Sequence, residues 1–205
     1  MVAARPFASE ASQALADILA REYAEEMDNQ STEMTPELAD LQADLQGKWK
    51  IVDNGPTVRM FRTVEESALK VQLSFHCQDA VEMEDEDPEE GEEPAVPVKF
   101  TATVTKAGQS MVFVCISEDA QIRIQSVAIT SLDVENVHEN GISASDYQGP
   151  EFVELAEDLN DAFHTFLEDD ALIDSDVAAY VSMMADFKEQ TEYVNFLQKA
   201  KSLVS

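Results

Sequence analysis

The sequence predicts an α+β protein built on an antiparallel sheet. Helical periodicity marks the start of the chain, alternation of apolar and polar residues marks its middle, and helical periodicity returns after Gly149-Pro150. Strands and helices are therefore segregated along the chain instead of alternating, which is typical of this class. The connections between the predicted strands are short, and parallel neighbours would need crossovers of about a dozen residues, so antiparallel pairing is expected.

Two helices are expected before the sheet. Apolar residues recur at three- and four-residue steps over residues 9–28, with Ser9 as the N-cap. A shorter helix is expected from Thr35, as its N-cap, to Gly47. Pro36 would occupy its first position, where a missing backbone N–H is tolerated.

About seven strands are expected, at 48–53, 57–64, 69–77, 98–105, 110–117 and 122–129, with a short one within 131–147. Arg62 interrupts the apolar side of the second of these. The apolar phase changes between Ile124 and Val127, which predicts a bulge near Ser126. Ala107-Gly108 is typical of a hairpin turn.

Helices should close the chain. Phe152, Leu155, Leu159, Phe163 and Phe166 form an apolar stripe with helical spacing. Asp174 or Ser175 is expected to cap the next helix, and a last helical stretch is expected around residues 193–203. The whole chain, residues 1–205, is predicted to form a single domain, with residues 78–97 as a disordered acidic loop.

The charge is far from neutral, with 42 acidic and 13 basic residues giving a formal charge of −29. This balance argues against direct binding to nucleic-acid phosphates or anionic lipid, which needs basic patches. It favours cationic partners such as Lys- and Arg-rich proteins. The densest acidic run lies between Asp79 and Glu93, where ten of fifteen positions are acidic.

The acidic run has two interpretations, a solvated loop that raises solubility or a surface that captures basic segments. The predicted binding residues are Asp79, Glu82, Glu84, Asp85, Glu86, Asp87, Glu89, Glu90, Glu92 and Glu93. Removing these ten carboxylates would change the formal charge only from −29 to −19. A capture surface should therefore also extend over other parts of the protein.

Catalysis, metal binding and cofactors are not indicated. The chain lacks nucleotide-binding, nucleophile-elbow and zinc motifs, so no cofactor is expected. An EF-hand loop starting at Asp85 would need glycine at its sixth position, and Glu90 stands there. A Ca²⁺ buffer and a small enzyme that uses paired carboxylates remain alternative functions.

No apolar run is long enough for a membrane span, and the first residues lack the apolar core of a secretory signal. Cys77 and Cys115 lie in apolar strand-like runs and are predicted to be reduced and buried.

Several segments of the chain together form a recognisable pattern: LADILAREYAEE at 15–26, GPTVRMFRTVEESALKVQLSF at 55–75 and SDYQGPEFVELAEDLNDAFHTFLED at 145–169. The most specific is KEQTEYVNFLQKAKSLV near the C-terminus. With these segments the chain resembles the mitochondrial glycoprotein family of acidic matrix proteins. One departure is Asp170-Ala171-Leu172, where the family often has Arg-Gly-Ile.

The resemblance implies a seven-stranded twisted antiparallel sheet flanked by one N-terminal and two C-terminal helices, in a doughnut-shaped homotrimer. It implies a non-enzymatic scaffold or chaperone of the mitochondrial matrix, linked to RNA processing, translation and respiratory maintenance. Helix or subunit packing is expected for Phe187, Tyr193, Phe196, Leu197 and Leu203.

Overall fold

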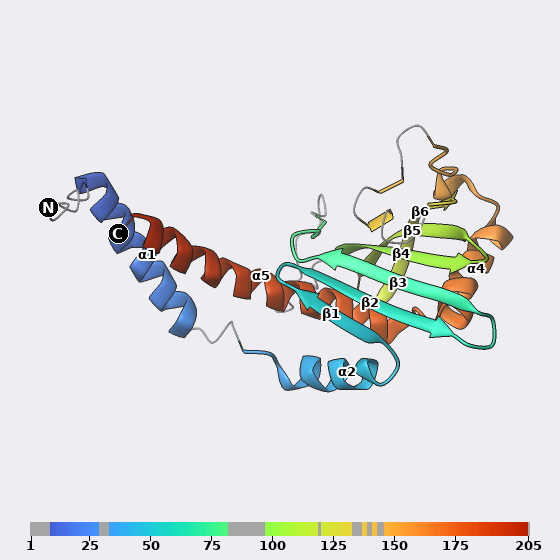
Figure 1. The fold of residues 1–205 in the computed structure, drawn as a ribbon, viewed down its shortest axis with the longest axis horizontal. Helices are drawn as coiled ribbons and strands as arrows, with labels where there is room; N and C mark the ends of the chain where they lie inside the picture. Colours follow the sequence, from blue (N-terminus) through green and yellow to red (C-terminus); the bar gives the residue numbers. More distant parts are fainter. Residues whose placement is uncertain are drawn as a thin grey trace, which may run out of the picture. The chain divides into compact units, whose positions relative to one another are not determined.

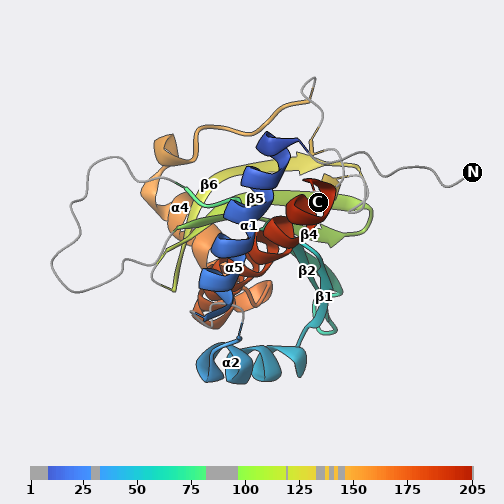
Figure 2. The same ribbon diagram turned by 90° about the vertical axis from the view of Figure 1, so that its left-hand side faces the viewer.

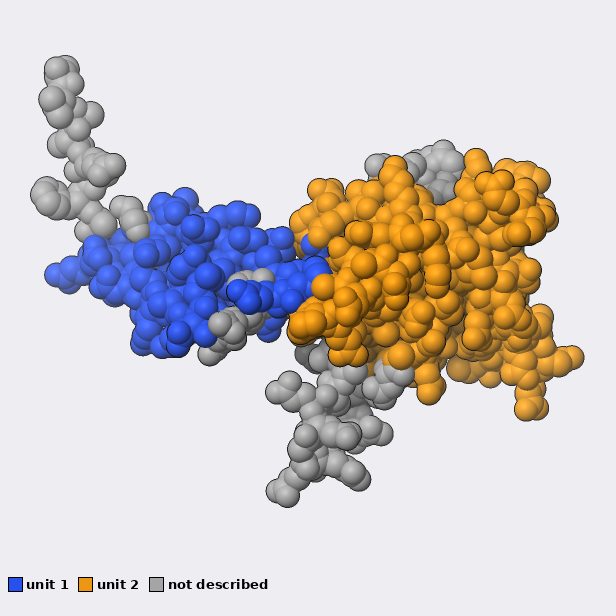
Figure 3. All heavy atoms as spheres, turned by 90° about the horizontal axis from the view of Figure 1, so that it is seen from below, with its two compact units in different colours: residues 1–34, 187–205 blue, residues 35–186 orange. Residues whose placement is uncertain are grey.

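The computed structural model describes residues 9–28, 33–81, 97–118, 120–132, 137–138, 141–142 and 146–204. The chain divides into two compact units, coloured separately in Figure 3. Unit 1 comprises residues 1–34 and 187–205, and unit 2 comprises residues 35–186. The helix α5, Ser175–Val204, contributes to both. The single domain and the disordered loop at 78–97 stay predictions.

The described part of unit 1 contains two helices, α1 (Glu10–Asp28) and the part of α5 from Phe187 onward. The predicted cap is confirmed, because Ser9 Oγ accepts a hydrogen bond from the backbone N–H of Ser12 at 3.1 Å. The two helices lie side by side (Figures 1 and 2). Their buried apolar residues are Ala16, Leu19, Val194 and Leu197.

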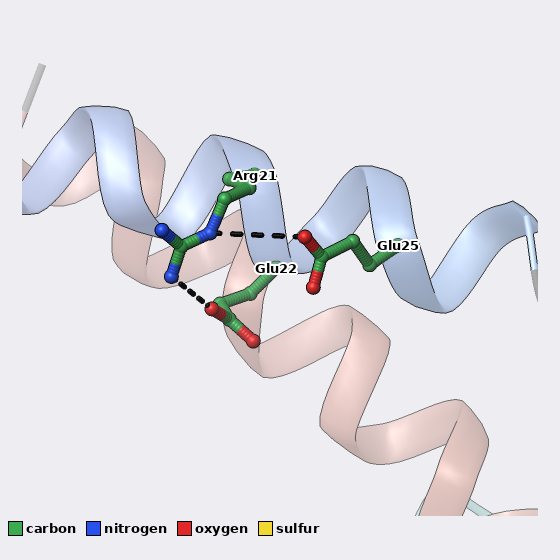
Figure 4. A network of polar contacts seen from close by, with 3 residues as sticks. All are labelled: Arg21, Glu22 and Glu25. Atoms are coloured by element: carbon green, nitrogen blue, oxygen red, sulfur yellow. Dashed lines mark hydrogen bonds and ion pairs between the residues drawn. The ribbon is translucent and has the colours of Figure 1, made fainter.

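The outer surface of α1 carries charged residues. The Arg21 Nη2 atom lies 2.7 Å from Glu22 Oε1, and its Nε atom lies 3.8 Å from Glu25 Oε1. Figure 4 shows the three side chains. These carboxylates raise the pKa of Arg21 above its ordinary value, chiefly through the hydrogen bond to Glu22. The pairs are exposed to solvent, so they contribute little to stability.

Unit 2 contains a six-stranded antiparallel sheet in the order β1-β2-β3-β4-β5-β6. Its strands are β1 (Lys50–Asn54), β2 (Thr57–Val64), β3 (Leu69–His76), β4 (Val98–Lys106), β5 (Gln109–Glu118) and β6 (Gln121–Thr130). Each strand pairs with its neighbour in sequence, as the short connections predicted.

The two faces of the sheet differ in polarity. One face carries the buried apolar core, represented by Val58, Met60, Leu73, Phe75 and Phe100. The alternate positions on the other face are largely Thr, Ser, Gln and Lys. This alternation is the pattern of a sheet with one face against a core.

Helices of unit 2 cover the apolar face. The first part of α5 is anchored there, because Ser117 Oγ of β5 donates a hydrogen bond to the Ala178 carbonyl at 2.7 Å. Phe75 of β3 meets Tyr180 of α5 edge to face, with ring centroids 6.5 Å apart. Burial raises the pKa of Tyr180 above its ordinary value.

The short helix α2, Pro36–Gln46, begins as predicted. Thr35 accepts a hydrogen bond from the Leu38 N–H at 3.2 Å, and Pro36 occupies the first turn. Leu38 and Leu45 are buried on its inner side.

Two irregularities of the sheet agree with the sequence. Val114 pairs with Ser126 while Cys115 pairs with Ile124, so β6 carries an extra residue where the bulge was predicted. Arg62 stands 5.8 Å from the centre of the Trp49 ring, which explains how a cation interrupts the apolar side of β2.

Two expectations about elements differ from the structure. The described sheet has six strands, and the described residues of 131–147 form no strand; beyond β6 there is only an isolated bridge between Ser126 and Glu151. The end of the chain is one continuous helix, α5, instead of a helix followed by a separate stretch. No glycine or proline interrupts its 30 residues, so nothing in the sequence ends it early.

Candidate functional site

The acidic run is joined to the sheet at a hydrogen-bonded base, formed by residues 79–81 and 97–99. The Val81 N–H donates to the Pro97 carbonyl at 2.7 Å, and the Lys99 N–H donates to the Asp79 carbonyl at 2.8 Å. Ala80 and Val98 form an antiparallel bridge between these two bonds. Residues 79–81 and 97–99 are therefore held against each other as an extension of the β3–β4 pairing.

Of the ten predicted binding residues, the structure places one. Asp79 is exposed, and its carboxylate accepts a hydrogen bond from the His76 N–H at 3.2 Å. The other nine lie outside the described residues: Glu82, Glu84, Asp85, Glu86, Asp87, Glu89, Glu90, Glu92 and Glu93.

A second acidic region lies in the described part of unit 2, over the 3₁₀ turn η1 (Phe152–Glu154), the helix α4 (Glu157–Thr165), the π-helical turn η2 (Phe166–Asp170) and the start of α5. We call residues 151–176 the second acidic segment. No Lys or Arg occurs between Arg123 and Lys188. The exposed carboxylates of the segment are Glu151, Glu154, Glu157, Asp158, Asp161, Glu168, Asp169, Asp170 and Asp176.

Aromatic side chains hold this segment on the apolar face of the sheet. Phe113 of β5 stacks on Phe166 with ring centroids 6.3 Å apart and meets Phe163 edge to face at 6.1 Å. Phe152 lies 5.9 Å from Phe163 and 6.0 Å from His164. Phe152, Phe163 and Phe166 of the predicted apolar stripe thus pack inward, whereas Leu159 is 45% exposed. The stripe is not one helix as expected, because α4 begins only at Glu157. The carboxylates of the segment are exposed to solvent.

The charges of the second acidic segment oppose local stability at one end. Glu168, Asp169 and Asp170 are the last residues of η2, which continues the helical run of α4, and at this end the helix dipole disfavours negative charge. Among the residues that the structure describes, none of the nine exposed carboxylates forms an ion pair. The side chains therefore remain available to an external cation.

Sequence reasoning placed the acidic site at 79–93 and did not single out residues 151–176. The sequence signal for this segment is the long stretch without Lys or Arg. A search for the densest run of acidic residues does not detect it. Sequence reasoning did anticipate that the negative charge would extend beyond the run.

The five predicted packing residues on α5 divide into two groups. Leu197 is 3% exposed and belongs to the core of unit 1, and Phe187 is half-buried. Tyr193, Phe196 and Leu203 are 36%, 59% and 87% exposed. On α1, the apolar Leu15, Ile18 and Met27 are also exposed.

The histidines and cysteines do not assemble a reactive centre among the described residues. Cys77 and Cys115 are buried thiols, and burial raises the pKa of Cys115, which suppresses its thiolate. His138 Nδ1 lies 2.7 Å from Ser74 Oγ, and burial, with the nearby Arg59, lowers the pKa of His138 to about 4. In this part of the chain no group of His, Cys, Asp and Glu could hold a metal ion.

No described helix combines the length and apolar character that crossing a membrane requires.

Comparisons with known proteins agree with one another. The family model described as mitochondrial glycoprotein (MAM33) matches residues 19–204. The mitochondrial acidic protein mam33 of Schizosaccharomyces pombe is 27% identical over 110 residues, which cover 51% of this chain and 40% of the yeast protein. The matched part therefore spans less than half of that relative.

Two solved structures share the fold. The crystal structure of the Trypanosoma brucei p22 protein matches with a TM-score of 0.69 and 17% identity, covering 96% of this chain and all of that one. A Leishmania major protein of unknown function, described as a sequence homologue of human p32, matches with a TM-score of 0.67 and 18% identity, over 95% and 99% of the two chains.

Proposed function

Since the chain belongs to the mitochondrial glycoprotein family, we propose that it is a non-enzymatic acidic scaffold of the mitochondrial matrix that captures Lys- and Arg-rich proteins. Through such partners it would support mitochondrial RNA processing, translation and respiratory maintenance. The location rests on the family and on the yeast relative, which is named a mitochondrial acidic protein.

The observation that carries this proposal is the second acidic segment. Its nine exposed carboxylates form no ion pair with the residues that the structure describes, and three of them lie where the helix dipole disfavours them. These charges lower local stability in the free protein, and a partner that neutralises them would remove that cost. A polycationic segment would do so, and its approach would be accelerated by the overall charge of −29.

We further propose that the protein assembles as a homotrimer through unit 1. Six apolar side chains on its two helices are exposed in the single chain: Leu15, Ile18, Met27, Tyr193, Phe196 and Leu203. Burying such side chains between subunits would remove them from water, as in an obligate interface. Three copies would also present three acidic surfaces to one partner and raise its apparent affinity.

The assembly is tested by light scattering on the purified chain. The expected mass is about three times 22.7 kDa. A Phe196→Asp variant should lower that mass while retaining the circular dichroism spectrum of the sheet. A monomeric wild-type chain would contradict the trimer and leave the capture function to be judged separately.

Capture is tested by titrating a deca-lysine peptide and measuring its affinity as a function of salt. In one variant a Gly-Ser linker replaces residues 82–96, which keeps the hydrogen-bonded base from Asp79 to Val81 and from Pro97 to Lys99. A second variant carries Glu168→Gln, Asp169→Asn and Asp170→Asn. Both should bind more weakly and show a shallower dependence of log K on log salt.

A matched control removes the same number of charges elsewhere. Glu37, Asp40 and Asp44 are exposed on α2, and their neutralisation should change binding less than that of residues 168–170. The capture proposal fails if the peptide binds equally to the wild type and to both acidic variants at every salt concentration.

A further inference from the structure

The polar face of the sheet carries a groove whose charge is opposite to that of the chain. The groove has a volume of about 970 Å³ and lies over β1, β2, β3 and the turn between β4 and β5, within unit 2. Its volume is in the range of small-molecule sites. Among its lining residues are Lys48, Lys50 and Lys70, and none of the lining residues that the structure describes is acidic.

Strand register explains why these residues gather. Residues directly opposite each other in an antiparallel pair share a face. Lys50 pairs with Phe61, and Phe61 pairs with Gln72, which forms one row across three strands. The next row contains Lys70, Thr105 and Ser110.

The cations of the groove are uncompensated within the part of the chain that the structure describes. Lys48, Lys50 and Lys70 form no ion pair there. The Nζ atom of Lys50 stands 6.0 Å from the centre of the Phe61 ring. Arg62 also lines the groove, but it pairs with Val71 and so belongs to the other face of β2, and we do not include it in the site.

A buried hydrogen-bond donor points to a ligand independently of the charges. Gln72 lines the groove and is 4% exposed, and its amide nitrogen Nε2 has no hydrogen-bond partner among the described residues. Native proteins rarely leave a buried donor unsatisfied, because its desolvation is then uncompensated. An oxyanion reaching the floor of the groove would satisfy it.

We propose that this groove binds a small phosphate-bearing anion. Lys50 and Lys70 supply charge from two adjacent rows, and the Gln72 amide supplies a neutral donor between the strands. At physiological salt the Debye length is about 8 Å, so the nearby ammonium groups dominate over the distant carboxylates. This basic groove is distinct from the surface proposed to capture basic proteins, because that surface is acidic.

The test is calorimetric titration of the full chain with inorganic pyrophosphate, ADP and citrate at equal ionic strength. Pyrophosphate and ADP should bind more tightly than citrate. A higher affinity for ADP than for pyrophosphate would indicate a nucleotide, and equal affinities would indicate the phosphate groups alone. Binding of citrate alone, or of none of the three at millimolar concentration, would overturn the proposal.

Charge-matched variants locate the site. The double variant Lys50→Gln and Lys70→Gln should lose affinity for pyrophosphate by about tenfold or more, since two charge-assisted contacts disappear. The control, Lys99→Gln with Arg123→Gln, removes two exposed cations that do not line the groove and should bind as the wild type does. Equal loss in both variants would mean that only net charge matters, which overturns the site.

The variant Gln72→Leu separates a ligand contact from a structural role. It removes the unsatisfied donor and keeps a similar volume, so the ligand-free melting temperature should stay the same or rise while pyrophosphate binds more weakly. A lower melting temperature with unchanged pyrophosphate affinity would show that Gln72 serves the fold and would remove it from the proposed site.

Discussion

At the scale of single residues, backbone conformation and burial set sharp limits. Gly149 adopts a φ of +90°, and a Cβ built there would stand 1.9 Å from the Val127 carbonyl oxygen. Gly141 has a φ of +68°, but a Cβ there would meet no atom of the described residues within 4 Å. The two glycines thus separate the effect of backbone strain from that of a steric clash.

We predict that Gly149→Ala is strongly destabilising. The new methyl group collides with the backbone of β6, which cannot give way without breaking strand pairing, so the loss should reach about 2–4 kcal/mol. Gly141→Ala is the control and should cost about 1 kcal/mol, for strain alone. Urea unfolding of the two variants measures the difference, and equal losses would contradict the clash.

Stability should also depend on pH through His138. Its pKa is about 4 in the folded protein, whereas the ordinary value of 6.5 applies when the chain unfolds. Between these two values the unfolded chain binds a proton that the folded one does not, so the stabilising effect of neutral His138 is present above pH 6.5 and is lost as the pH falls toward 4. Because the ring is only partly shielded from solvent, we expect a loss of about 1–2 kcal/mol.

This pH effect is measured as a difference, since the many carboxylates also titrate in the acid range. The free energy of unfolding of the wild type minus that of His138→Gln should fall between pH 6.5 and 4 and then level off. A difference that stays constant over this range would show that His138 does not cause the effect.

At the scale of elements, the sequence predicted the pieces that have local signals. Ser9 and Thr35 cap the helices that they were expected to cap, and Asp174 accepts a hydrogen bond from the Val177 N–H at 3.1 Å at the start of α5. The bulge in β6 could be predicted because an inserted residue shifts the apolar alternation.

Features without a local signal could not be predicted. Nothing in the sequence ends α5 early, but which side of each half of the helix is buried depends on what that half packs against, and periodicity does not report this. The groove on the polar face depends on register across three strands, which places Lys50 and Gln72 in one row although they are distant in sequence. The second acidic segment escaped notice because its carboxylates alternate with the aromatic residues that anchor it.

The position of charge along α4 and η2 leads to an element-scale prediction. Neutralising Glu168, Asp169 and Asp170 should raise the free energy of unfolding by about 0.5–1 kcal/mol at low salt, because it removes mutual repulsion and an unfavourable interaction with the helix dipole. Neutralising Glu157 and Asp158, in the first turn of α4, should lower it instead. Chemical denaturation compares the two, and shifts of the same sign would refute the dipole argument.

At the scale of the whole molecule, the formal charge of −29 opposes folding through self-repulsion. Salt shortens the Debye length from about 30 Å at 0.01 M to about 3 Å at 1 M, so screening should relieve this repulsion. We therefore predict that the melting temperature rises with NaCl concentration, by calorimetry.

The rise should be smaller in the variant that lacks the charges of residues 168–170 and smaller again when residues 82–96 are also replaced. A melting temperature that is independent of salt, or that falls, would mean that stabilising ion pairs outweigh the repulsion. The ion pairs of Arg21 are exposed and contribute little to stability, so we expect the repulsion to outweigh them.

The hydrogen-bonded base of the acidic run, residues 79–81 and 97–99, affects how freely the residues between its two sides can vary among relatives. The Val81 N–H donates a hydrogen bond to the Pro97 carbonyl, so the pairing that extends β3 and β4 is already formed at these two residues. Each doubling of a flexible connection adds only about 0.6 kcal/mol of closure entropy. Insertions, deletions and changes of composition between these two residues should thus be nearly neutral for folding. This position can gain or lose acidic residues under selection for a partner alone.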